Sequence, residues 1–211
     1  MGWSRRDHHL CAKRGDNILR RKDRLRYRDL VRRITFLSVL TALSSTFYVL
    51  ENLLPFPVPF GRWGFSNSVV LMIASEIGFG DALIVASAKS ILGALFSGRF
   101  LSPSFLTGFF GAVSAALVES LLARFDFGYL SLSAMGSFVN NLVQLIVISF
   151  LVESTKTFLL FPLMVILGLV SGTVNAFLAS RMGGIVFENY SRFFFAQKKA
   201  ADEVAGDRVR S

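Results

Sequence analysis

The stretch that decides the fold runs from Glu51 to Asn67 and reads Glu-Asn-Leu-Leu-Pro-Phe-Pro-Val-Pro-Phe-Gly-Arg-Trp-Gly-Phe-Ser-Asn. It joins the first long apolar run to the second. Prolines at alternate positions hold a backbone extended, and glycines let it turn or approach another surface closely, so we expect a stiff cap over whatever lies beneath. We call this cap the gating loop, and its members are Pro55, Pro57, Pro59, Gly61, Trp63 and Gly64.

The composition predicts a membrane protein. Hydrophobic residues make up 53% of the 211 residues, and the mean hydropathy is +0.54. Both values are too high for an ordinary water-soluble domain.

The positive charge is concentrated at the N-terminus. Residues 1–33 hold twelve Lys and Arg against four Asp, directly before an apolar run. Lys and Arg at this place are typical of a cytoplasmic flank that also attracts anionic lipid, so we favour lipid binding over nucleic-acid binding. Cys11 is the single cysteine, and the adjacent His8-His9-Leu10-Cys11 lacks metal-ligand spacing. We therefore expect no intrachain disulfide, metal or cofactor.

The apolar runs predict an all-α integral membrane bundle of six transmembrane helices, since each run approaches the length that crosses a bilayer. Only the second is short, and it is expected to be tilted or partly buried. The predicted helices are Ile34–Leu53, Ser66–Gly78, Asp81–Gly98, Pro103–Ala123, Ser131–Val152 and Phe158–Ser180.

An even number of spans puts both termini on one side, which the basic flanks predict to be the cytoplasmic side of the cell membrane. The expected division is a basic segment 1–33, a membrane domain 34–182 and a cytoplasmic tail 183–211 that is disordered at its end. Ser38, Ala42 and Thr46 recur every four residues in the first span. A face of small side chains lets another helix approach closely in lipid, although ordinary internal packing would explain it equally.

Polar residues inside the apolar runs predict a ligand cavity. Lys89 stands at mid-span, where an amine must be paired, neutral or in contact with a polar space, and Glu51, Glu76 and Glu119 are its candidate partners. Asn140 and Gln144 share a helical face. Interhelical hydrogen bonding is the alternative for any one amide. The candidate binding residues are Glu51, Asn52, Arg62, Asn67, Lys89, Asn140, Asn141 and Gln144.

Catalysis finds little support in the sequence. Both histidines lie in the N-terminal segment, and there is no Asp-rich pair of the kind that holds magnesium on a diphosphate. We predict no catalytic residue and leave enzymatic activity undecided.

The pattern Glu51-Asn52-x-x-Pro55-Phe56-Pro57-Val58-Pro59 followed by Gly61-Arg62-x-Gly64-x-x-Asn67 resembles a known membrane family. This family is described both as heptaprenyl diphosphate synthase component I and as the Gx transporter family. Further matching positions are Lys89, Gly93, Gly98, Ser102-Pro103-Ser104-Phe105, Gly111 and Asn141-x-x-Gln144. Family members often have Arg where Lys89 stands and His where Asn140 stands, so the ligand contacts of this chain can differ.

The resemblance implies a fold similar to the substrate-binding S components of energy-coupling-factor vitamin transporters. Such a protein holds a small ligand under its first loop and works with a coupling subunit and ATPases. The coupling subunit would meet the face of Ser38, Ala42 and Thr46. Our main interpretation is a membrane transport subunit for a small metabolite. The alternatives are a membrane accessory subunit of polyprenyl diphosphate synthesis, with a synthase subunit as partner, and a scaffold that anchors a partner complex.

Overall fold

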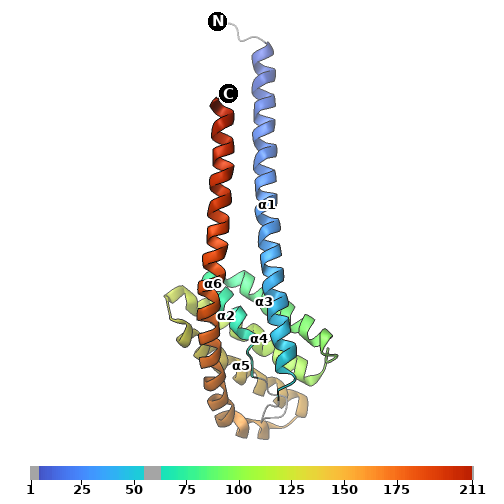
Figure 1. Cartoon of the computed structure of the whole chain (residues 1–211). Helices are drawn as coiled ribbons and strands as arrows, with labels where there is room; N and C mark the ends of the chain where they lie inside the picture. Colours follow the sequence, from blue (N-terminus) through green and yellow to red (C-terminus); the bar gives the residue numbers. More distant parts are fainter. Residues whose placement is uncertain (1–4, 55–62, 211) are drawn as a thin grey trace. The chain divides into compact units, whose positions relative to one another are not determined.

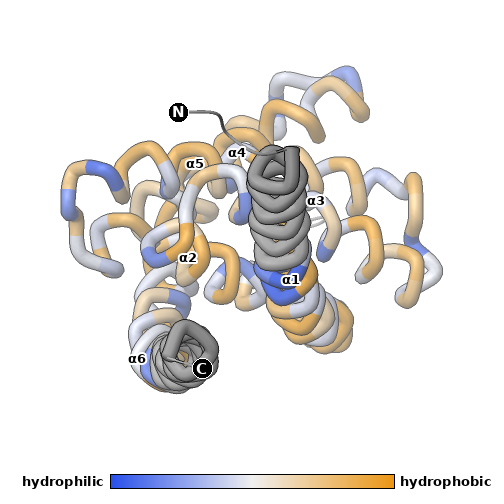
Figure 2. Tube along the Cα trace, turned by 90° about the horizontal axis from the view of Figure 1, so that it is seen from above, coloured by the Kyte–Doolittle hydropathy of each residue, from blue (hydrophilic) through white to orange (hydrophobic). Residues whose placement is uncertain are grey.

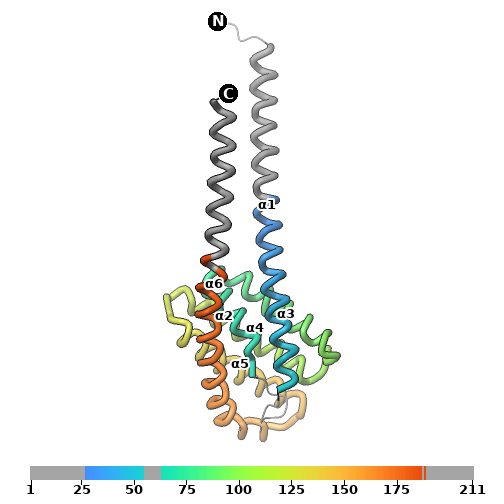
Figure 3. Tube along the Cα trace, viewed as in Figure 1, coloured from blue at the N-terminus to red at the C-terminus, as the bar shows by residue number. Residues whose placement is uncertain are grey.

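The structure is a computed structural model, whose helices are labelled in Figure 1. It describes the backbone of residues 5–54 and 63–210 and the side chains of residues 27–54, 63–186 and 188, most of which are coloured in Figure 3. Every regular element among these residues is helical. In chain order the elements are α1 (Arg5–Glu51), α2 (Asn67–Glu76), α3 (Phe79–Phe96), α4 (Pro103–Leu122), the 3-10 helix η1 (Ala123–Phe125), α5 (Tyr129–Val152), the 3-10 helix η2 (Thr155–Leu160) and α6 (Phe161–Arg210).

The chain divides into two compact units, residues 1–40 and residues 41–211. In the first unit, Asp29 and Arg32 form an ion pair at 4.0 Å one helical turn apart. The second unit contains the last part of α1 and all the other helices. The predicted division at residues 33 and 182 remains a prediction.

Five helical segments of the described chain are long and apolar enough to cross a membrane. They cover residues 27–51, 79–96, 103–125, 129–152 and 155–186. In the second unit the trace is hydrophobic along the helices, and hydrophilic positions gather mainly at the turns (Figure 2). The predicted all-α membrane bundle is thus confirmed.

The second helix is short and buried, as its sequence predicted. Helix α2 has only ten residues, Asn-Ser-Val-Val-Leu-Met-Ile-Ala-Ser-Glu, about 15 Å at the usual rise and half a bilayer core. Val69 to Ile73 are each at most 1% exposed, because α2 contacts α3, α4, α5 and α6. A helix that is apolar on every side is expected at the centre of a bundle, and α2 occupies this place (Figure 1).

Two hydrogen bonds show which helix ends share a side of the second unit. Asn52 Nδ2 donates to Ser97 Oγ at 3.1 Å, which joins the ends of α1 and α3. Tyr129 Oη donates to Glu76 Oε1 at 2.7 Å, which joins the end of α2 to the start of α5. Helices α2 and α3 therefore form a hairpin that starts within the bundle, turns at Gly78 (φ +143°) and returns to the end of α1.

Helices α4, α5 and α6 pack through glycines that receive polar side chains. Glu119 of α4 lies against Gly136 of α5, and Asn141 of α5 lies against Gly168 of α6. A Cβ added to Gly172 would stand 2.8 Å from Ser137 Oγ. Glycine lets helix backbones approach closely in lipid, and here it also makes room for buried polar groups.

Candidate ligand site

The segment that leads into α2 is buried at Ser66 and half-buried on either side of it. Gly64 has a φ of +78°, a conformation that glycine adopts without strain. Its carbonyl accepts the Asn67 backbone N–H at 2.9 Å, and the carbonyl of Phe65 accepts the Ser68 N–H at 3.1 Å. We call residues Gly64–Asn67 the α2 lead. It begins one residue after the described chain resumes at Trp63.

Two residues of α1 and one of α6 hold the backbone of the α2 lead. Ser44 Oγ donates to the Ser66 carbonyl at 2.8 Å, and the Glu51 carboxylate accepts the Ser66 N–H. From the opposite direction, Asn175 Nδ2 donates to the Gly64 carbonyl at 3.1 Å. Irregular backbone is tolerated at membrane depth only where protein or a polar space satisfies it, and these three side chains do so.

Lys89 of α3 holds the side chains of the α2 lead. It is only 1% exposed, and its Nζ donates to Ser66 Oγ at 3.1 Å and to Asn67 Oδ1 at 2.5 Å. A buried amine is costly unless hydrogen bonds and charges compensate it. Of its predicted carboxylate partners, Glu51 binds the same lead, and Glu119 lies near enough to interact with Lys89 electrostatically. Glu76 is bonded instead to Tyr129 at the far end of α2.

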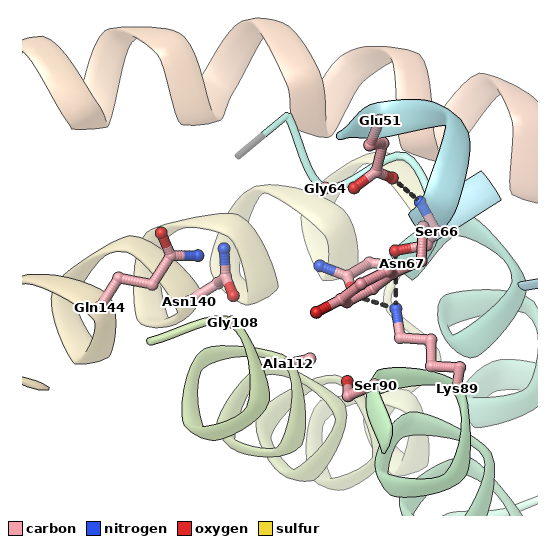
Figure 4. A pocket seen from close by; sticks show the side chains of 11 residues that line it. Glu51, Gly64, Ser66, Asn67, Lys89, Ser90, Gly108, Ala112, Asn140 and Gln144 are labelled. Atoms are coloured by element: carbon pink, nitrogen blue, oxygen red, sulfur yellow. Dashed lines mark hydrogen bonds between the residues drawn. The ribbon is translucent and has the colours of Figure 1, made fainter. Parts of the chain in front are cut away.

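A small cavity lies beside the α2 lead, and Figure 4 shows Asn140 and Gln144 of α5 across it from Glu51, Asn67 and Lys89. The centre of a water molecule has about 20 Å³ to occupy there, which is enough for one or two water-sized groups. The cavity is lined by Tyr48, Glu51, Gly64, Ser66, Asn67, Lys89, Ser90, Gly108, Ala112, Asn140 and Gln144.

The amides of α5 have few partners in the described part of the chain. Gln144 is 5% exposed, and its Oε1 has no hydrogen-bond partner there. Asn140 Nδ2 reaches Asn141 Oδ1 at 3.5 Å, the outer limit of a hydrogen bond. Gly111 of α4 makes room for both amides, because a Cβ at this position would stand 2.5 Å from Asn140 Oδ1 and 3.1 Å from Gln144 Cγ.

The structure brings five of the eight predicted binding residues together at the cavity: Glu51, Asn67, Lys89, Asn140 and Gln144. Asn141 turns away, and its Nδ2 donates to the Met164 carbonyl of α6 at 2.7 Å. Asn52 lies at the end of α1, where it bonds Ser97. Arg62 falls outside the described residues. That these residues bind a substrate stays a prediction.

Sequence reasoning missed several residues that line the cavity, namely Tyr48, Ser66, Ser90, Gly108 and Ala112. Ser66 could have been suspected because it is next to Asn67. The others are small or aromatic residues of apolar helices, and nothing in their type distinguishes them from packing residues.

The gating loop and the small-residue face are only partly described. Pro55, Pro57, Pro59 and Gly61 lie outside the described residues, whereas Trp63 stacks on Phe65 with ring centroids 6.0 Å apart. The side chains of Ser38, Ala42 and Thr46 are exposed. Thr46 Oγ1 donates to the Ala42 carbonyl at 2.9 Å, and Ser38 Oγ donates to the Ile34 carbonyl at 2.8 Å. Hydroxyls bonded to their own helix leave this face without unmet polar groups.

Apolar spanning helices around a polar cavity define a multi-pass helical membrane protein. The family model described as heptaprenyl diphosphate synthase component I matches residues 40–182, which include the last part of α1, all of α2 to α5 and the first part of α6. The chain belongs to this family. No curated protein and no solved structure matches the chain significantly.

Proposed function

We propose that the chain is the membrane accessory subunit, component I, of a heptaprenyl or related polyprenyl diphosphate synthase. The observation that carries this proposal is the family match over residues 40–182. A protein described as component I implies a second component as partner. Long prenyl chains are strongly apolar, so a subunit with five spanning helices is suited to keep their synthesis at the membrane.

We assign the catalytic step to the partner subunit and an accessory role to this chain. Prenyl transfer from a diphosphate requires magnesium held by carboxylates. Among the described side chains, no three His, Cys, Asp or Glu residues gather in a way that could hold a metal ion. The partner subunit would then supply the diphosphate chemistry, and this chain would supply the membrane site.

Co-expression with a catalytic polyprenyl diphosphate synthase from the same cell tests this proposal. Affinity purification of this chain should retain the synthase, and membranes that contain both should extend farnesyl diphosphate with labelled isopentenyl diphosphate. Membranes that contain the synthase alone should form less long-chain product. Equal product length and yield without this chain would refute the accessory role.

The polar cavity favours a second candidate, a small-metabolite transport subunit similar to an S component. Gln144 Oε1 is buried in the cavity wall without a partner in the described chain, as expected for a group that awaits a ligand. Uptake of labelled vitamins and flavins by cells that express the chain would test transport. Co-purification of a coupling subunit and an ATPase would distinguish it from the synthase role, and a scaffold would show neither activity.

The topology is part of the same proposal. We place both termini in the cytoplasm, with the basic segment 1–33 against anionic lipid of the cell membrane. Cys11 is the only cysteine, so a membrane-impermeant maleimide should label it in inverted vesicles and not in intact cells. The opposite pattern would reverse the orientation.

A further inference from the structure

The two walls of the cavity differ in how their polar groups are occupied. On the α2 side, Lys89 donates to Ser66 and Asn67, and the Glu51 carboxylate accepts the Ser66 N–H. On the α5 side, Gln144 Oε1 accepts no hydrogen bond from the described chain. Gln144 Oε1 is thus a buried acceptor in the cavity wall that the described chain leaves for a new hydrogen bond.

The two amides of α5 are placed to act together. Asn140 and Gln144 are one helical turn apart, both line the cavity, and Figure 4 shows both beside it. A carboxamide offers an acceptor oxygen and a donor NH₂, so the pair suits a group with an adjacent donor and acceptor of its own. Asn and Gln recognise the paired donor and acceptor edge of adenine in this way.

We propose that the cavity binds the neutral, amide-like end of a small molecule, a carboxamide, ureido or lactam group, through Gln144 and Asn140. This inference rests on the second candidate function, metabolite binding, and is independent of the accessory role. Charge supports it, because the described lining residues include one lysine and one glutamate, whose charges balance. Size supports it too, since room for one or two water-sized groups matches the oxygen and nitrogen of one amide.

A stability comparison tests the inference without knowledge of the natural ligand. In Gln144→Leu a buried amide without a partner becomes an apolar group of similar size, so the melting temperature of the ligand-free protein in detergent should rise by about 2–4 °C. The matched control is Asn141→Leu, which leaves the Met164 carbonyl without its donor and should lower the melting temperature. If Gln144→Leu is destabilised like Asn141→Leu, the amide is structural and the inference fails.

Binding of acetamide and acetate supplies the chemical test. The two probes have nearly the same shape, and only acetamide is neutral and carries the N–H donors. Acetamide should raise the melting temperature of the wild-type chain more than acetate does, and Gln144→Leu should bind it about tenfold to a hundredfold more weakly. Equal responses to the two probes, or an equal acetamide response in Gln144→Leu, would mean that the cavity holds only water. Failure of uptake with amide binding retained would refute transport alone.

Discussion

The two walls of the cavity show two different uses of buried polarity in a membrane bundle. The α2 wall carries the charged residues, Lys89 and Glu51, and they bind the chain's own Ser66 and Asn67. The α5 wall carries neutral amides, and Gln144 Oε1 has no partner in the described residues. An unpaired charge costs far more to bury than an unpaired amide, and in this cavity the charged Lys89 and Glu51 are the residues that bind the α2 lead.

This difference changes the role that we assign to Lys89 and Glu51. A lysine and a glutamate within apolar helices are expected to mark the binding site. Here they first secure the α2 lead, and α2 is the helix at the centre of the bundle. The charged wall thus stabilises the fold around the cavity, and the amide wall is the better candidate for ligand selection.

The largest effect is expected for Lys89→Met. The substitution removes the donor to Ser66 Oγ and Asn67 Oδ1 and leaves the Glu119 carboxylate without this positive charge. Hydrogen bonds to charged groups are worth about 1.5–3 kcal/mol each, so we expect a loss of about 3 kcal/mol and a melting temperature about 6–12 °C lower. Thermal unfolding in detergent measures this fall in melting temperature.

Lys156→Met is the matched control, because Lys156 is exposed in η2. It should leave the melting temperature unchanged. A Lys89→Met chain with the melting temperature of the wild type would mean that the charged wall does not hold the α2 lead. The charged wall would then contribute no more to the stability of the fold than the amide wall does.

Gly111→Ala should have the next largest effect, and it acts on the amide wall. The new Cβ would stand 2.5 Å from Asn140 Oδ1 and 3.1 Å from Gln144 Cγ, so α4 and α5 must move apart or the amides must turn. Overpacking of this kind costs about 1–3 kcal/mol, and the melting temperature should fall by about 5 °C. Gly80→Ala is the control, since no atom lies within 4 Å of its added Cβ. Equal melting temperatures for both variants would show that the helices and amides of this wall accommodate the added methyl group without a cost in stability.

The sequence allowed the helices and one feature of the cavity to be predicted. Apolar runs of about twenty residues predicted the spans because the bilayer sets their length. Asn140 and Gln144 could be placed on one face because the helical period alone decides that. The burial of Lys89 followed from its position in the middle of an apolar run.

The rest depended on how the helices are rotated and how deep each lies. Asn141 is adjacent to Asn140, yet its rotation of about 100° along the helix directs it to Met164 of α6. The sequence also could not show that α2 starts within the bundle, because the hydrogen bonds to Gly64 and Ser66 come from Asn175 and Ser44, far away in the chain. Contacts over such separations come from tertiary packing and leave no periodic pattern.

A smaller effect separates the hydroxyls that hold the α2 lead from those that do not. Ser44 is fully buried and donates to the Ser66 carbonyl at 2.8 Å, so Ser44→Ala should lose about 1 kcal/mol, the usual net value of a hydrogen bond. Ser38→Ala is the control, because Ser38 is exposed and bonds only within its own helix. Unfolding curves for the two variants should differ by a few degrees. Coincident curves would contradict the role of Ser44.

The smallest effect on the isolated chain is expected for Ala42→Phe on the exposed small-residue face. Nothing in the described bundle covers Ala42, so the free energy of unfolding should change by less than about 0.5 kcal/mol. If this face meets a partner helix, the bulky ring should nevertheless prevent co-purification of the partner subunit. Leu43→Phe, also on an exposed but already bulky position, is the matched control and should retain the partner. Loss of the partner in both variants, or in neither, would show that the small side chains do not form the docking surface.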